Sequence, residues 1–237
     1  MSDSSVDFIG DRAMNGQSET WLLGEKLPAN VRDFSDQVAW EDHKIRFIVT
    51  HCRGKDVLDL GCVQHNPENY KSKYWVHKAL TRSAKSVDGI DLYENGVNYL
   101  KSIGYNITVG NAERFRLEKR YDVIVAGDLI EHLENLGDFF ECCKLHLRPE
   151  GKLLISTPNP WHWRFILKAA LFKGRVKPNA EHTLWICPTV LSNMASRHDL
   201  KVTDWQFGSR YLKDRLIPLP KGIKHGSFHA VICMNIQ

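Results

Sequence analysis

The sequence contains no apolar run that approaches the ~20 residues a membrane-spanning helix needs, so we expect no bilayer span. Its first residues are polar and lack the basic and apolar regions of a secretory signal, and we therefore expect a cytoplasmic protein. Internal repeats and low-complexity tracts are also missing, which excludes a repeat architecture. The absence of a membrane-spanning segment does not exclude that the protein binds peripherally to a membrane surface.

Cysteine is sparse, and its spacing excludes two further classes of protein. The six cysteines include no C-x-x-C pair and no zinc-like spacing, so neither a zinc module nor a disulfide scaffold is expected. We interpret all six as reduced thiols, as in other cytoplasmic proteins. The net charge of +4 permits an acidic partner but does not require a nucleic acid, and no RNA-binding module is recognisable.

What the sequence does contain is a regular alternation of strand and helix patterns. With 237 residues, 43% apolar, one α/β domain with an embellishment is the natural expectation. The alternation predicts a doubly wound α/β fold with a seven-stranded, mostly parallel sheet and helices on both faces. The predicted strands are 55–60, 86–91, 105–109, 121–126, 152–156, 200–207 and 228–235, the last of them an inserted inner strand.

We divide the chain into three parts. Residues 1–34 form an N-terminal flap or mobile segment, and residues 35–237 form the main domain, in which Ser35 caps the first helix. Residues 158–187 interrupt the alternation after strand five and are interpreted as a helical lid inserted there.

Two strand ends point to a nucleoside pocket. The apolar strand Val57–Leu60 ends at Gly61, where bare backbone can approach a ligand, and the next strand ends at Asp91, which can accept hydrogen bonds from ribose hydroxyls. The alternative, a nicotinamide-binding domain, needs G-x-G-x-x-G after the first strand, and only one glycine is present there.

Five motifs in order resemble the class I S-adenosylmethionine-dependent methyltransferases over roughly residues 50–160. They are Val57–Cys62, Gly89–Asp91, Gly110–Glu113, Tyr121–His132 and Leu147–Leu153. The resemblance implies S-adenosylmethionine as cofactor, with contacts from Asp59, Gly61, Cys62, Asp91, Leu92, Asn111, Ala112 and Asp128. The chain departs from the family in the loop after Gly61, which has no further glycines, and at Asn111, where an aspartate is common.

The segment after strand four carries the candidate chemistry. Asp128, Glu131 and His132 are similar to the E-x-x-E-H magnesium site of ubiquinone-pathway O-methyltransferases and small-RNA methyltransferases. By that resemblance these three residues and His182 would bind Mg²⁺ or another divalent ion that holds and acidifies an acceptor hydroxyl. Without a metal, His132 is the best general base, followed by His162 and His182.

The composition of the predicted lid indicates what kind of acceptor the protein binds. Aromatic residues gather between Trp161 and Phe172, and basic residues including Arg164, Lys168 and Lys173 lie among them. These patterns favour a small-molecule or glycan acceptor, including an anionic one such as a phosphorylated or uronic sugar, or docking to a lipid surface. The alternative is an ordinary buried helix with solvated ends.

The preferred interpretation is therefore an enzyme that methylates a hydroxyl of a small molecule or glycan. Two alternatives stay open. One is an RNA 2′-O-methyltransferase with a metal-assisted site, and the other is a binding protein that has kept the fold without catalysis.

Overall fold

The computed structural model describes residues 36–174 and 179–235. The flap predicted for residues 1–34 lies outside the described residues. Within the described ranges, each helix is too short or too polar to cross a membrane. All six cysteines are free, as the sequence predicts.

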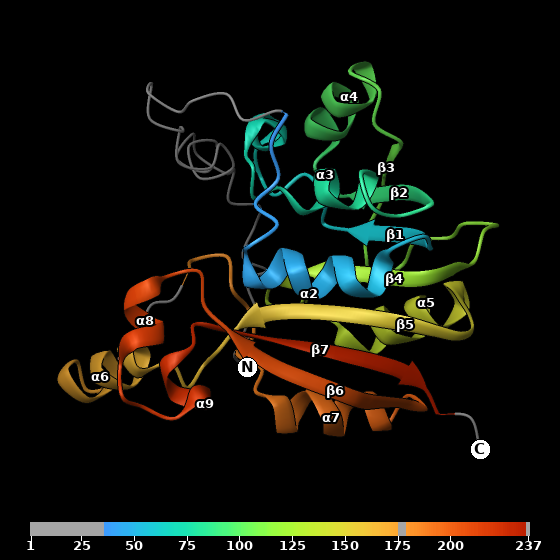
Figure 1. Cartoon of the computed structure of the whole chain (residues 1–237). Helices are drawn as coiled ribbons and strands as arrows, with labels where there is room; N and C mark the ends of the chain where they lie inside the picture. The colour runs from blue at the N-terminus through green and yellow to red at the C-terminus, as the bar shows by residue number, and fades with distance from the viewer. Residues whose placement is uncertain (1–35, 175–178, 236–237) are drawn as a thin grey trace, which may run out of the picture. The chain divides into compact units, whose positions relative to one another are not determined.

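A seven-stranded sheet in the order β3-β2-β1-β4-β5-β7-β6 forms the centre of the fold, which confirms the predicted architecture (Figure 1). Strand β7 runs antiparallel between β5 and β6, as the prediction of an inserted inner strand requires. The strands are β1 Asp56–Leu60, β2 Ser86–Asp91, β3 Ile107–Val109, β4 Tyr121–Gly127, β5 Leu147–Pro158, β6 Leu200–Gly208 and β7 Ser227–Met234.

Helices cover both faces of this sheet. Helices α2 and α3 pack on one face, and α5 and α7 pack on the other, so the sheet is doubly wound. The described helices are α2 His43–Cys52, α3 Val76–Thr81, α4 Glu94–Ser102, α5 Leu136–His146, α6 Trp163–Leu171, α7 Pro188–Ser196, α8 Leu212–Leu216 and α9 Lys221–Lys224, with short 3₁₀ turns η1 Pro67–Lys71 and η2 Ile130–His132.

The two-residue period of the strands divides the core between the faces. In β1, Leu58 and Leu60 join the cluster that contains Phe140 of α5, whereas Val57 joins the cluster that contains Ile48 of α2. All of these side chains are at most 1% exposed. Both faces of a central parallel strand are buried, which is why the strand reads as a continuous apolar run in the sequence.

The predicted beginning of the first helix is wrong. Helix α2 begins at His43, and residues 36–42 are not helical. Asp42 caps it instead, because its carboxylate accepts hydrogen bonds from the amides of Lys44 at 3.0 Å and Ile45 at 3.2 Å. Ser35, the predicted cap, lies outside the described residues.

Strand β5 is longer than predicted at both ends. It begins at Leu147 rather than Lys152, and the irregular pairing of this first part is accommodated by a register shift against β4 between Tyr121 and Val123. At its other end Thr157 and Pro158 still pair with β7. The polar Thr157 is thereby held rigidly at the carboxyl end of the sheet.

Residues 158–187 contain the helix that the sequence predicts between Trp161 and Phe172. This helix, α6, has no buried residue, and Leu171 is 67% exposed. The interpretation of this segment as a buried helix is therefore wrong. Figure 1 shows α6, α8 and α9 beyond the carboxyl end of β5.

Gly89 provides a test of the packing between β2, β1 and β3. A Cβ atom there would lie 2.8 Å from Cys62 Sγ and 2.9 Å from Ile107 Cγ1, both inside the core. We expect Gly89→Ala to lower the free energy of unfolding by about 1–3 kcal/mol through overpacking. The matched control is Gly226→Ala, where no atom lies within 4 Å of the added carbon. Equal melting temperatures for the two variants would contradict this account.

Candidate functional site

The carboxyl ends of the parallel strands form one rim, and the predicted site residues lie along it. Leu60 of β1 pairs with Ile90 of β2 and with Ala126 of β4. Gly61, Asp91 and Asp128 consequently follow three neighbouring strands at the same edge. In open α/β sheets, ligands bind at this edge, where the strand order reverses.

Asp91 lies where β2 ends, and its carboxylate organises two loops. One oxygen accepts a hydrogen bond from the Val63 amide at 2.8 Å, and the other accepts one from the Tyr93 amide at 2.9 Å. Burial raises the pKa of Asp91, and these two amides partly offset that effect. A carboxylate oxygen has two acceptor positions, so both oxygens can still accept from ribose hydroxyls.

The predicted adenine-side residues lie beside Asp91 on the rim. Leu92 is 69% exposed directly after it. Asn111 follows β3, and its side-chain oxygen accepts a hydrogen bond from the Glu113 amide at 2.8 Å. Ala112 is buried next to it. An exposed leucine between two polar turns offers an apolar surface to a flat ring, but the contacts with adenine stay a prediction.

The loop after β1 follows an unusual path. Gly61 has a positive φ of 74°, and a Cβ there would approach Leu129 Cδ1 at 3.0 Å. Gln64 and His65 then adopt positive φ values of 57° and 63° in succession. A left-handed conformation costs a non-glycine residue about 1–2 kcal/mol, so this path needs stabilising contacts.

Two of the predicted cofactor residues face inward. Asp59 is 3% exposed, and its carboxylate lies 2.9 Å from Nδ1 of the buried His77. Cys62 is 2% exposed, burial raises the pKa of its thiol, and its carbonyl oxygen accepts from the Trp75 indole at 2.7 Å. Both residues anchor the base of the loop, and their direct contacts with a cofactor stay predictions.

Asp128 is paired with a residue that the sequence analysis did not single out, Lys44. Its carboxylate lies 2.6 Å from the Lys44 ammonium and accepts from the Ser156 hydroxyl at 2.8 Å. Burial alone raises the pKa of Asp128, but the charge of Lys44 and these hydrogen bonds hold it below the usual range. No sequence pattern connects Lys44 with Asp128, because Lys44 is a single lysine in helix α2, 84 residues earlier in the chain.

The pKa of Glu131 is shifted in the opposite direction to that of Asp128. It is 2% exposed and accepts a hydrogen bond from the Thr157 hydroxyl at 2.9 Å. Burial, and next the nearby negative charge of Asp128, raise the pKa of this carboxyl. The two carboxyl groups after β4 therefore differ in protonation tendency, with Asp128 favouring the ionised form.

Histidines gather beside Glu131. The rings of His132 and His182 lie 4.8 Å apart, and the possible ligand atoms of these two residues and Glu131 all lie within 4.8 Å of one another. Burial lowers the pKa of His132, and the neighbouring His182 and His65 lower it further. The lowered pKa favours the neutral form of the His132 imidazole.

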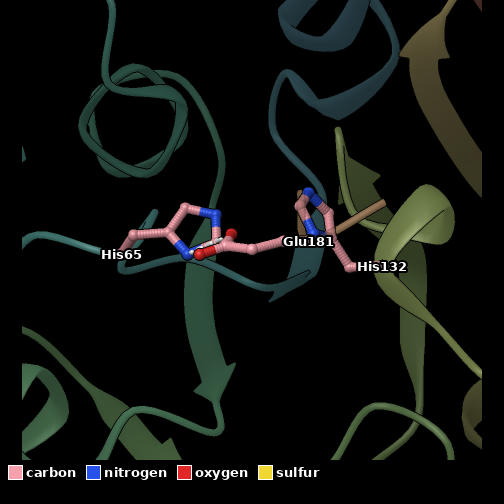
Figure 2. Close-up of side chains that lie close together, drawn as sticks. All are labelled: His65, His132 and Glu181. Atoms are coloured by element: carbon pink, nitrogen blue, oxygen red, sulfur yellow. Dashed lines mark ion pairs between the residues drawn. The ribbon is translucent and has the colours of Figure 1, made fainter. Parts of the chain in front are cut away.

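A second group of possible ligands shares His132. It consists of His65, His132 and Glu181, whose ligand atoms also lie within 4.8 Å of one another (Figure 2). Among the described residues, Asp128 belongs to neither group. Sequence reasoning did not connect His65 or Glu181 with His132.

The third predicted histidine lies elsewhere. His162 Nε2 is 3.7 Å from Asp214 Oδ2, beside α8, and the residue is 6% exposed. Its position supports a role in holding α6 against α8 rather than a role beside His132. A catalytic role of His162 stays a prediction.

A cavity of about 390 Å³ opens on the other half of the rim, within the 300–1,000 Å³ range of small-molecule sites. Its charged groups form two pairs, Lys44 with Asp128 and Arg210 with Asp42 at 3.3 Å. The fully buried His229 also lines it, stacked on Phe47. The lining residues are Asp42, His43, Lys44, Asp128, Pro158, Ser209, Arg210, Tyr211, Gly226, Ser227 and His229.

Comparison with known families gives one match over most of the chain. The profile of the family described as "Methyltransferase domain" matches residues 35–208. That range includes every strand of the described sheet except β7 and all of the predicted site residues, whereas the cavity-lining residues from Ser209 onward lie outside it.

Curated relatives and solved structures agree with this match. Ubiquinone biosynthesis O-methyltransferase of Paraburkholderia phytofirmans is 27% identical over 65% of this chain and 68% of that protein. The mitochondrial enzyme of the same name from Bos taurus is 24% identical over 68% of this chain and 46% of that protein. An S-adenosylmethionine-dependent methyltransferase from Clostridium acetobutylicum has the same fold, with a TM-score of 0.56, 12% identity, and coverage of 92% of this chain and 98% of that one.

The burial of His229 predicts a pH dependence of stability. Burial, and next the adjacent His43, lower its pKa from 6.5 to about 3. The unfolded chain therefore binds a proton below pH 6.5 that the folded protein does not, and stability falls as the pH falls through this range. His229→Gln removes this contribution. The stability of the wild type relative to the variant should drop by about 2 kcal/mol between about pH 7.5 and about pH 5.

Chemical denaturation at both pH values measures that difference. Any packing cost of the glutamine is the same at both pH values and cancels. A difference in stability that stays constant would show that His229 protonates normally in the folded protein.

Proposed function

Because the chain belongs to the methyltransferase-domain family and is an S-adenosylmethionine-dependent methyltransferase, we propose that it methylates a hydroxyl of a small-molecule or glycan acceptor. The names of the O-methyltransferase relatives support the choice of oxygen as the accepting atom. The 390 Å³ cavity supports an acceptor of small-molecule size.

One observation carries this proposal: the two halves of the rim meet between β1 and β4. The candidate cofactor residues Gly61 and Asp91 follow β1 and β2, whereas the cavity begins at Asp128 after β4. Neighbouring strands are about 4.8 Å apart, so a cofactor on one half and an acceptor in the cavity come into contact at this boundary. Methyl transfer requires that contact.

The main contribution of the protein to methyl transfer is to position the cofactor and the acceptor. S-adenosylmethionine, when bound, supplies a methyl group on a sulfonium, which moves to the acceptor oxygen by in-line displacement. Asp91 orients the ribose. His132 does not line the cavity but follows Asp128 by four residues, and it is our candidate for taking the proton that the acceptor hydroxyl loses. A neutral imidazole near pH 7 is suited to that transfer, and the lowered pKa of His132 keeps it neutral.

Metal-assisted transfer is a second candidate, favoured by the group Glu131, His132 and His182. These residues fit a divalent ion because their possible ligand atoms lie within 4.8 Å of one another. Asp128 fits it poorly, since Lys44 and Ser156 already engage its carboxylate. The ion would hold the acceptor hydroxyl and lower its pKa.

The cavity favours an acceptor rich in hydroxyl groups. Its acids and bases are paired with one another, so the net charge at its wall is close to balanced. Ser209, Ser227 and Tyr211 add hydroxyls, and Tyr211, 57% exposed, offers an aromatic face to a sugar ring. A strongly anionic acceptor would have to displace one of the carboxylates from its cation.

The exposed helix α6 favours an additional contact with a lipid surface. Ile166 and Leu167 are each about half exposed, and Lys168 lies on the same helix. Apolar residues beside a cation are typical of helices that lie in the interface of a membrane.

Replacing Asp91 tests the cofactor half of the site. We expect Asp91→Ala to weaken binding of S-adenosylmethionine at least about tenfold in calorimetry, because a charge-assisted hydrogen bond contributes ~1.5–3 kcal/mol. The matched control is Glu94→Gln, a few residues on at the beginning of α4, which should bind normally. Unchanged affinity in a folded Asp91→Ala protein would rule out this pocket.

Replacing His132 tests the acceptor half. His132→Ala should lower turnover about 10²-fold or more, as expected for loss of a general base, while affinity for S-adenosylmethionine is retained. His198→Ala, which removes a histidine paired with Glu141 outside the rim, serves as control. Full activity of His132→Ala would remove this residue from the mechanism.

A further inference from the structure

The loop after β1 places His65 against the histidines that follow β4. The rings of His65 and His132 lie 5.3 Å apart, and those of His132 and His182 lie 4.8 Å apart, so three imidazoles form a row. Glu181 lies beside them, with its carboxylate 3.5 Å from His65 Nδ1. Figure 2 shows the Glu181 carboxylate directed at the His65 ring, with the His132 ring on its other side.

These residues come from three separate parts of the chain. His65 belongs to the loop between β1 and η1, and His132 ends η2 after β4. Glu181 and His182 belong to the segment between α6 and α7, which is fastened here by hydrogen bonds from Thr183 to the Glu131 and Leu133 carbonyl oxygens. An ion at this point would join all three parts.

We propose that His65, His132 and Glu181, assisted by His182, hold one divalent transition-metal ion that fastens the cofactor loop to the segment leading into α7. The ligand atoms of the first three residues lie within 4.8 Å of one another, a spacing that one ion can span with small side-chain movements. Two imidazoles with one carboxylate, and the His182 imidazole beside His132, suit Zn²⁺, Co²⁺ or Ni²⁺, whereas Mg²⁺ prefers oxygen ligands.

The His65–Glu181 ion pair alone does not explain the shape of the loop. Its side chains are 51% and 35% exposed, and pairs of that kind contribute at most about 1 kcal/mol. The left-handed conformations of Gln64 and His65 cost about 1–2 kcal/mol each. A metal bound by His65 would stabilise the loop by more than this cost, since metal–ligand bonds at structural sites are much stronger.

The proposed ion is coupled to the cofactor site through the loop. Val63, two residues before His65, donates its amide hydrogen bond to the Asp91 carboxylate at 2.8 Å. An ion that fixes His65 therefore also fixes the loop that covers Asp91. By thermodynamic reciprocity, metal and S-adenosylmethionine must then strengthen each other's binding by the same factor.

Metal titration of the purified full chain tests the site itself. After treatment with a chelator, Co²⁺ is added and its visible absorption and binding heat are recorded. We expect about one equivalent bound with the intense absorption of tetrahedral cobalt, and at least about tenfold weaker binding in His65→Ala and in Glu181→Gln. Glu68→Gln, in the adjoining turn η1 and paired with Lys71, is the matched control. Binding that is equally strong in His65→Ala would overturn the proposal, as would the absence of Co²⁺ and Zn²⁺ binding by the wild type.

The coupling is measured by the affinity for S-adenosylmethionine with and without Zn²⁺. We expect tighter binding with Zn²⁺ in the wild type and in Glu68→Gln, and no effect of Zn²⁺ in His65→Ala. An identical response in His65→Ala would show that the loop does not carry the coupling.

These measurements do not depend on methyl transfer. An imidazole nitrogen that binds a metal cannot take a proton, so Zn²⁺ should slow turnover where His132 acts as the base. Metal binding with unaffected turnover would leave the metal site standing and contradict only the base role of His132.

Discussion

The shared direction of five parallel strands is the constraint on which the rest of this structure depends. Because β1, β2 and β4 pair in register, the residues that follow them reach one rim although they are far apart in the chain. Asp91, Asp128 and His132 owe their proximity to this arrangement rather than to any contact among themselves.

The antiparallel strand β7 completes the other half of the rim. Because β7 runs against β5, its first residue, Ser227, meets the last residue of β5, Pro158. The end of β6 arrives at the same place, where Gly208 pairs with Ser227. The cavity is thus enclosed by the ends of four strands and the beginning of α2, and its shape depends on residues near the carboxyl end of the described chain.

The two carboxylates after β4, Asp128 and Glu131, have different partners on this rim, and this difference sets their protonation. Lys44 compensates Asp128, so that one carboxylate stays ionised at the boundary between the two halves. Glu131 accepts a hydrogen bond from the Thr157 hydroxyl at 2.9 Å, and burial, followed by the negative charge of Asp128, raises its pKa. Burial lowers the pKa of His132 and of His182, and neighbouring imidazoles lower both further, whereas the Glu181 carboxylate acts in the opposite direction.

The sequence by itself determined the strand and helix order, the inner position of β7 and the family, because apolar periodicity and motif order are local properties of the chain. It also predicted Asp91, Glu131 and His132 as site residues, because they lie at or shortly after the ends of predicted strands. Only the tertiary structure decided that α2 begins at His43, that Lys44 neutralises Asp128, and that His65 and Glu181 meet His132. Those contacts depend on the paths of loops and on helix placement, which packing between distant segments sets and no local pattern records.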